Sequence, residues 1–177
     1  MAVAETLSRF RQDPLALRRF SGSREDGSFT GFGYPVNNML GEGKIVLDPQ
    51  TWQLKFSGNV AMPLVLDYEQ ILAMPSVEKT VTLDCTDGWY STQVWRGVPL
   101  ADLLQLVGSK RSALGMEPKA ASGYFAVLSM LEAPDTILAT HVGGVAFDHG
   151  HGARLRAVVP ARRGWQWVKW LVRVKVL

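Results

Sequence analysis

The chain has 177 residues, of which 47% are hydrophobic and 20% charged, and its formal net charge is +3. These values are typical of a folded domain with a substantial core and do not favour a disordered chain. A single cysteine excludes an internal disulfide framework. No apolar run approaches the ~18 residues of a membrane-spanning helix, and the N-terminus lacks the apolar segment of a secretory signal. We therefore expect a soluble protein without direct membrane insertion, cytoplasmic if the chain is complete and extracytoplasmic if it was cut from a membrane-fused protein.

The predicted elements begin after an N-terminal tail or linker over residues 1–20, and residues 21–177 are expected to form a single domain. Residues 21–43 contain six glycines and are predicted to form a long loop. A loop of this length inside a compact domain is usually functional or mobile. After it, alternating apolar and polar residues over 52–57 predict a strand.

Two short helices are predicted. Asp67 is placed to cap a helix over 68–74. Within 97–108, Pro99 stands in the first turn and apolar residues recur at helical spacing, which is the clearest helical pattern in the chain. The other predicted elements are strands over 77–83, 123–129, 154–159 and 171–176, a turn or helical turn over 130–134, and apolar structure over 137–142. The pattern favours an α+β fold, with a mixed, mostly antiparallel sheet and a few short helices packed outside it.

The only cysteine, Cys85, follows the strand predicted over 77–83 and precedes residues typical of a loop. A side chain at the end of a strand is well placed to reach a bound group. A lone cysteine is most often a small buried hydrophobe. If Cys85 is functional, its thiolate is a nucleophile, a redox group or a metal ligand.

A glycine-rich segment carries two of the three histidines, His149 and His151. One hypothesis is a zinc site at this pair, completed by His141 or Cys85. Histidines on such loops more often form hydrogen bonds with the backbone or with an anion.

Residues 160–170 alternate basic and tryptophan side chains, a pattern that stacks bases and holds phosphates in some nucleic-acid-binding proteins. Three tryptophans in strand-like alternation are more often part of a core. Because the basic excess is small and no nucleic-acid-binding motif is present, we expect no nucleic-acid partner.

An ordered set of motifs along the chain is more specific than any one of them. The set comprises Cys85 followed by Gly88-Trp89, the segment from Trp95 to Leu104, Leu138-Ala139, the run from His151 to Arg156 with Val159-Pro160, and Gly164 with the run from Val168 to Leu171. This order resembles the molybdopterin-binding domain of the sulfite oxidase family, over residues 52–176. The small bacterial domains often fused to a cytochrome b-type membrane segment are the most similar variety.

The resemblance implies a sulfite oxidase-like fold and a molybdenum-molybdopterin cofactor. Cys85 matches the family cysteine whose thiolate binds molybdenum, and a soft thiolate suits such a metal. His151, Arg156 and Lys169 match residues of the family's cofactor-binding segments. A phosphate-bearing cofactor needs such cations, and Arg makes bidentate contacts where Lys supplies a point charge.

Further site residues follow from the same resemblance. Trp165, Gln166 and Trp167 are expected to border the cofactor. Asp87 and Tyr90, close to the metal ligand in sequence, are candidate catalytic residues that act beside the metal, although structural roles are equally compatible with their positions.

The chain also departs from the family pattern. Arg154 stands where a proline is usual, either as a cation near the cofactor phosphate or facing solvent. Residues 86–88 and 31–33 replace the arginine-containing segments of the sulfite-oxidising members. The pocket for sulfite is therefore not reproduced, and sulfite is not expected as the substrate.

We predict a molybdenum-pterin oxidoreductase domain that catalyses oxygen-atom or electron transfer on a small-molecule substrate. No heme motif is present in this chain, so an external electron-transfer partner is expected, such as a cytochrome b-type membrane protein. The alternative is a non-catalytic module that kept the fold but lost the metal, as part of a membrane redox complex.

Overall fold

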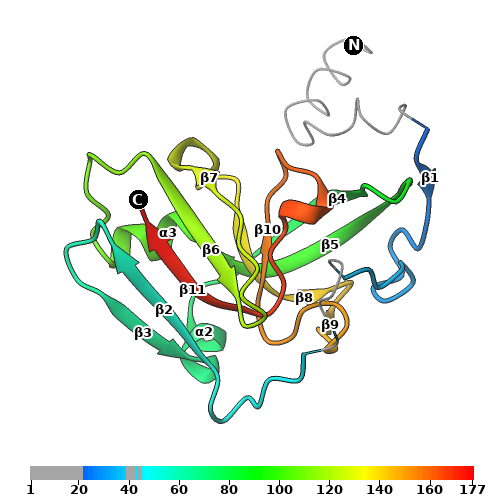
Figure 1. The fold of residues 1–177 in the computed structure, drawn as a ribbon. Helices are drawn as coiled ribbons and strands as arrows, with labels where there is room; N and C mark the ends of the chain where they lie inside the picture. The colour runs from blue at the N-terminus through cyan, green and yellow to red at the C-terminus, as the bar shows by residue number, and fades with distance from the viewer. Residues whose placement is uncertain (1–21, 39–42, 44) are drawn as a thin grey trace.

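The computed structural model describes residues 22–38, 43 and 45–177. Two β-sheets with a few short helices make up this part of the chain (Figure 1). The predicted α+β fold with mostly antiparallel strands is confirmed. The tail predicted over residues 1–20 lies outside the described residues.

The first sheet has six strands and is organised around the long strand β5 (Trp89–Pro99). β4 (Val77–Cys85) pairs with one edge of β5 in antiparallel register, which ends with Cys85 opposite Trp89. The other edge of β5 pairs in parallel with β1 and antiparallel with β8. The remaining strands are β1 (Arg24–Glu25), β8 (Ile137–Val142), β9 (Val145–Ala146) and β10 (Arg156–Val158).

The second sheet has five strands in the order β3 (Leu64–Asp67), β2 (Gln53–Gly58), β11 (Leu171–Val176), β6 (Gly115–Ala120) and β7 (Leu128–Ser129). β2 and β11 run parallel, and the other pairs are antiparallel. Alternate side chains of these strands, such as Leu54, Phe56 and Val174, are buried, as the alternating sequence predicts. Each such side chain contributes roughly 1.5–3 kcal/mol of burial free energy.

Both predicted helices are present. α2 (Tyr68–Ala73) begins with a capping box, in which the Asp67 carboxylate accepts from the Gln70 amide at 2.8 Å and the Gln70 side chain accepts from the Asp67 amide at 2.9 Å. α3 (Leu100–Leu106) follows directly from β5 and starts after Pro99. The described residues also contain two single-turn 3-10 helices, η2 (Met130–Glu132), where a helical turn is predicted, and η3 (Gly164–Gln166).

The sequence predicts a loop after Cys85, but only residues 86–88 form a turn, after which the chain re-enters the sheet as β5. Polar residues occupy inward positions of this strand, so its sequence lacks the apolar–polar alternation by which a strand is predicted. Ser91 and Gln93 are buried and hydrogen-bonded to each other, with 2.9 Å between the Gln93 amide nitrogen and the Ser91 hydroxyl. The prediction fails because hydrogen-bonded polar residues replace the apolar half of the usual alternation.

Two further strand predictions are too long, and the strands β1, β3, β6 and β9 are missed in addition to β5. The strand expected over 123–129 is reduced to β7, and the one expected over 154–159 is reduced to β10. β6 is not predicted, because Glu117, Pro118 and Lys119 interrupt its apolar pattern. β6 is nevertheless held by β11 on one side and β7 on the other.

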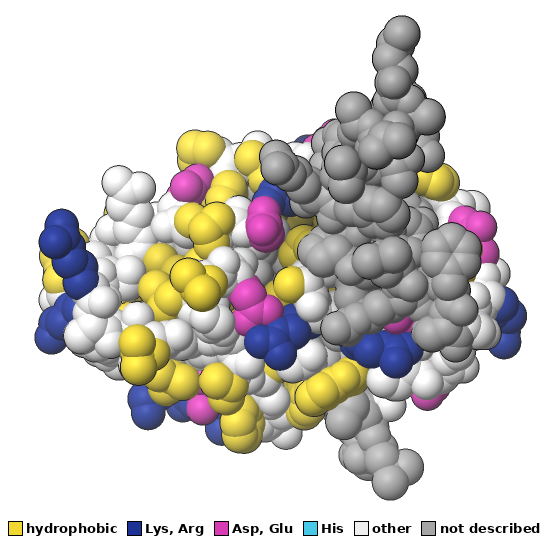
Figure 2. Space-filling view, turned by 90° about the horizontal axis from the view of Figure 1, so that it is seen from above, with side chains coloured by type: hydrophobic (Ala, Val, Ile, Leu, Met, Phe, Trp, Pro, Cys, Tyr) yellow, Lys and Arg dark blue, Asp and Glu magenta, His cyan; other side chains and the backbone are white. Residues whose placement is uncertain are grey.

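The surface carries both signs of charge. On the part of the upper face where described residues are visible, Lys and Arg side chains are interspersed with Asp and Glu side chains and with hydrophobic ones (Figure 2). No helix in the described part of the chain has both the length and the hydrophobicity needed to span a membrane.

Candidate functional site

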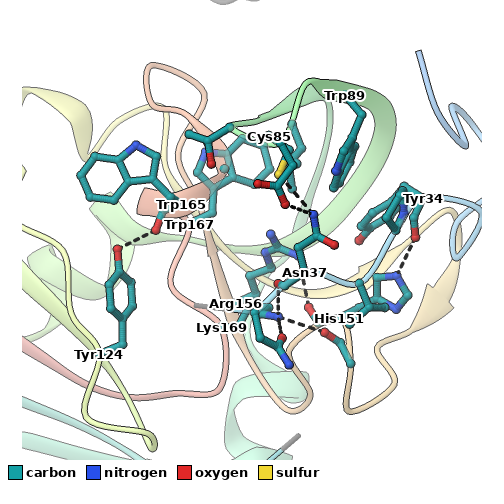
Figure 3. Close-up of a pocket in the computed structure, with 18 residues that line it drawn as sticks. Tyr34, Asn37, Cys85, Trp89, Tyr124, His151, Arg156, Trp165, Trp167 and Lys169 are labelled. Atoms are coloured by element: carbon teal, nitrogen blue, oxygen red, sulfur yellow. Dashed lines mark hydrogen bonds between the residues drawn. The ribbon is translucent and has the colours of Figure 1, made fainter. Parts of the chain in front are cut away.

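A pocket of about 360 Å³ lies where the β4–β5 hairpin, the segment after Gly33, the β10 region and η3 meet (Figure 3). The residues that line it lie far apart in the sequence, between Tyr34 and Lys169. The lining residues are Tyr34, Pro35, Val36, Asn37, Asn38, Leu83, Cys85, Thr86, Asp87, Trp89, Tyr124, Gly150, His151, Arg156, Gly164, Trp165, Trp167 and Lys169.

Cys85 is the last residue of β4 and lies on the pocket wall. It is directly opposite Trp89 across the hairpin, and opposite residues of an antiparallel pair share a face of the sheet. Trp89 accordingly lines the pocket too. Tyr90, one position along β5, alternates to the other face and is not among the lining residues.

The other side of the same hairpin fixes Cys85 in place. The Asp84 carboxylate, completely buried, accepts from the Arg163 guanidinium at 3.1 Å and from the Ser23 hydroxyl at 3.3 Å. The same Arg163 nitrogen donates to the backbone oxygen of Cys85 at 3.1 Å. The end of β4 is therefore tied to the chain that leads into η3.

Asn37 is a pocket residue that the sequence does not single out. Its side-chain amide donates to the Cys85 sulfur at 3.7 Å and also to the Asp87 carboxylate. Only the predicted long loop over 21–43 pointed to this segment. Nothing in the local pattern indicates which polar residue of that loop reaches the cysteine.

Arg156, on β10, supplies a buried positive charge. Its side chain is over the rings of Trp95 and Trp167, at 5.5 and 5.8 Å from the ring centroids, and donates to the backbone oxygen of His151 at 3.3 Å. Burial lowers the pKa of Arg156, and the nearby Tyr34 and Cys85 counteract this. Its Nε has no hydrogen-bond partner among the described residues.

His151 is buried beside Arg156. The Asp148 carboxylate accepts from the His151 backbone amide at 2.7 Å and lies 2.8 Å from its Nδ1. The Nε2 of His151 lies 3.5 Å from the backbone oxygen of Tyr34. Burial raises the pKa of the Tyr34 hydroxyl to about 12, so this group stays neutral and able to donate.

Lys169 closes the pocket from the side of the glycine-rich segment. Its ammonium donates to the backbone oxygens of Asn37 at 2.9 Å and Gly150 at 3.2 Å, and to the side chain of Asn38. Gly152 packs against it with φ of 110°, and an added Cβ would lie 3.1–3.3 Å from Lys169. A side chain at position 152 would therefore strain the backbone and displace the lysine.

The pocket wall offers donors without partners. The Tyr34 hydroxyl, the Trp89 indole nitrogen and the Arg156 Nε are buried with no hydrogen-bond partner in the described part of the chain. Buried donors are normally satisfied, so these three indicate an acceptor-rich ligand. With one thiol added, the set fits a group that carries phosphate, polar rings and a thiophilic metal.

The structure brings most of the predicted site residues together. Cys85, Asp87, His151, Arg156, Trp165, Trp167 and Lys169 all line the pocket, whereas Gln166 and Tyr90 do not. Trp165 is 47% exposed and Trp167 is buried, so only Trp165 presents a free ring at the rim.

The hypothetical zinc site lacks its third ligand. His141 lies on β8, where its Nε2 is 2.7 Å from Arg96 and its Nδ1 is 2.8 Å from the Thr140 hydroxyl. No three His, Cys, Asp or Glu side chains within the described ranges form a group that could hold a metal ion. Arg154 also lies elsewhere, over the ring of Tyr68 at 5.8 Å, and does not line the pocket.

The thiol, the cations and the unpartnered donors of this pocket are compatible with an anionic, metal-bearing cofactor. Residues 42–177 match the family model of the oxidoreductase molybdopterin-binding domain. The chain belongs to this family, and the resemblance found in the sequence is confirmed.

Three relatives illustrate the family. The chain is 31% identical over 149 residues to the protein-methionine-sulfoxide reductase catalytic subunit MsrP of Gluconobacter oxydans, which covers 73% of this chain and 48% of that protein. It is 31% identical over 127 residues to the uncharacterized oxidoreductase YuiH of Bacillus subtilis, covering 70% of this chain and 64% of that one. The structure of the sulfane dehydrogenase SoxCD from Paracoccus pantotrophus superposes with a TM-score of 0.72 at 28% identity, covering 76% of this chain and 40% of that one. The chain thus spans about half the length of these proteins.

Proposed function

We propose that this domain is a molybdenum-pterin oxidoreductase in which the Cys85 thiolate binds the metal. The observation that carries the proposal is the convergence of Cys85, Arg156, His151 and Lys169 on one pocket. These residues come from β4, β10 and two loops, and only the fold brings them together. The thiol and the cations are the two kinds of group that such a cofactor requires.

In this proposal, different side chains bind different parts of the cofactor. Arg156, buried and with an unpartnered Nε, would pair with phosphate oxygens of the cofactor. Tyr34 and Trp89 would donate to acceptors of the pterin rings. Lys169 and Asn37 close the wall beside Cys85, where the Asn37 amide orients the sulfur. The bound cofactor supplies two-electron redox chemistry and oxygen-atom transfer.

The chain's own residues favour reduction of a neutral oxo-substrate over oxidation of sulfite. Asp87 lines the pocket near Cys85, and a carboxylate there repels a sulfite anion. We propose a small sulfoxide or N-oxide as the substrate, in keeping with the name of the MsrP relative. Reduction consumes two electrons and two protons and releases one water. Asp87 is the residue proposed to pass a proton, whereas Tyr90, on the other face of β5, is not proposed to act in the pocket.

The two electrons come from a separate donor. We propose that a cytochrome b-type membrane protein passes them one at a time to this domain, which itself carries no heme in this proposal. The MsrP relative is named as a catalytic subunit, which is in keeping with such a division of labour.

Metal and pterin analysis tests the assignment. The protein is produced in a host supplied with molybdate and able to make the pterin, alongside Cys85→Ser. We expect near-stoichiometric molybdenum and pterin in the unchanged protein, and loss of molybdenum with retention of pterin in Cys85→Ser. A protein without molybdenum or pterin under these conditions would instead support the non-catalytic module.

A further inference from the structure

A second groove lies on the solvent face of the sheet that contains β2, β11 and β6. It encloses about 660 Å³ and is bordered by the segment before β2 and by the turn after β6. Three cations line it, Lys55, Lys119 and Arg173, against one carboxylate, Asp48. The proposed cofactor site uses none of these residues.

Strand register places the three cations in one row. Arg173 on β11 lies opposite Lys55 on β2 and opposite Lys119 on β6. Neighbouring strands are about 4.7–4.9 Å apart, so the row crosses two inter-strand spacings. Like charges directly opposite one another destabilise a sheet. Negative charge placed above such a row relieves this repulsion.

Within the described residues this charge is compensated only in part. One nitrogen of Arg173 pairs with the Glu117 carboxylate at 2.5 Å, but its Nε is buried without a hydrogen-bond partner. Lys55 and Lys119 form no ion pair with any residue that the structure describes. The groove therefore offers two free ammonium groups and an unsatisfied guanidinium N–H.

The groove shares a wall with the cofactor pocket. Residues 120–123 line the groove, and the next residue, Tyr124, lines the pocket. The Tyr124 hydroxyl donates to the backbone oxygen of Trp165 at 2.7 Å (Figure 3). The Ala121 amide donates to the backbone oxygen of Trp170 at 2.9 Å. A molecule seated in the groove therefore lies against one side of the turn whose other side closes the pocket.

We propose that this groove docks an acidic helix on the surface of the protein that supplies electrons to the cofactor. Acidic side chains three or four residues apart on a helix are about 5–6 Å apart, which matches the spacing of the cation row. Electron-transfer encounters use interfaces below about 1,200 Å², and charge attraction speeds their formation. The role in electron supply rests on the proposed function, whereas the affinity for an acidic helix does not.

Binding of a defined probe tests the docking site directly. The probe is a fluorescently labelled helical peptide with glutamates three and four residues apart, and its binding to the cofactor-loaded protein is followed by anisotropy. In Lys55→Glu/Lys119→Glu we expect the affinity to fall by about tenfold or more, and in the unchanged protein we expect it to weaken as salt is added.

A matched variant controls for net charge. Lys110→Glu/Arg111→Glu reverses the same number of cations at exposed positions outside the groove and should bind the peptide like the unchanged protein. A peptide with glutamines in place of glutamates should bind to none of the proteins. Equal binding by the unchanged protein and the groove variant, or an equal loss in the control variant, would overturn the docking site.

A kinetic measurement tests the role in electron exchange. The dithionite-reduced holoenzyme is reoxidised either by ferricyanide, an anion, or by hexaammineruthenium(III), a cation, each of which accepts one electron, so that two equivalents are consumed per two-electron oxidation. We expect Lys55→Glu/Lys119→Glu to slow the ferricyanide reaction by about tenfold without slowing the hexaammineruthenium reaction. An unchanged ferricyanide rate together with lost peptide binding would overturn the assignment to the electron donor. A protein without molybdenum would contradict the proposed function but leave the peptide measurement valid.

Discussion

The side-chain amide of Asn37 donates a hydrogen bond to the sulfur of Cys85 at 3.7 Å, across 48 positions of the sequence. The same amide contacts the Asp87 carboxylate, and the Asn37 backbone oxygen accepts from the Lys169 ammonium at 2.9 Å. One residue of the long loop therefore touches the proposed metal ligand, the carboxylate beside it and a cation of the pocket.

Removal of the Asn37 amide should lower the reduction potential of the bound metal. A donor to a thiolate sulfur withdraws negative charge and so favours the reduced state, and its loss in Asn37→Leu should shift the potential down by an amount on the order of tens of millivolts. Potentiometric titration followed by electron paramagnetic resonance of Mo(V) measures the shift. Asn38→Leu, which removes a Lys169 contact but leaves the sulfur contact, is the matched control. Equal shifts in the two variants would contradict the prediction.

Arg156→Met should weaken cofactor binding without lowering the stability of the cofactor-free protein. Because Arg156 is buried with an unpartnered Nε, its loss should leave the cofactor-free protein as stable as before or more stable. The same change should reduce the pterin content at least about tenfold, because Arg156 is the one buried Lys or Arg among the described residues that line the pocket. Released pterin fluorescence and thermal unfolding measure the two effects. Arg154→Met, two positions away and outside the pocket, should keep its pterin.

The sequence predicts those parts of the fold that follow a local pattern. β2, β4 and β11 alternate apolar and polar residues, and α2 and α3 carry their own start signals. β6 escapes prediction because its place depends on two partner strands, and not on its own composition. β5 also escapes prediction, because the inward-facing Ser91 and Gln93 are polar. Their burial is compensated by hydrogen bonds that form only in the fold.

The candidate site is predictable only as an ordered set. No spacing rule relates Cys85 to His151, Arg156 and Lys169, and their common pocket was implied by the family resemblance alone. The family resemblance did not imply a role for Asn37, because the contacts of a loop residue depend on which residues the fold packs against it. The hairpin register does explain why Trp89 joins the pocket and Tyr90 does not.

Arg163→Met should destabilise the protein. The completely buried Asp84 carboxylate accepts from Arg163, and its second oxygen has no partner among the described residues. Removing the arginine takes away the ionic partner of this buried charge and leaves it only the Ser23 hydroxyl, which should lower the free energy of unfolding by about 3 kcal/mol. Urea unfolding of the cofactor-free protein measures the change. The double variant Asp84→Asn/Arg163→Met should recover part of the loss, and failure to recover any would contradict this origin of the effect.

Glu132→Gln should remove a pH-dependent contribution to stability. Two nitrogens of Arg162 donate to the Glu132 carboxylate at 2.5 and 2.8 Å, and these bonds hold the pKa of Glu132 below its ordinary value of 4.5. A lowered pKa in the folded state contributes stability that is fully present above the ordinary value and is lost as the pH falls through the lowered one. The free energy of unfolding of the unchanged protein should therefore exceed that of Glu132→Gln by about 1 kcal/mol at neutral pH. This difference should vanish in strong acid. Urea unfolding across this range measures the difference, and a gap that stays constant down to acid pH would show that the carboxylate charge is not its source.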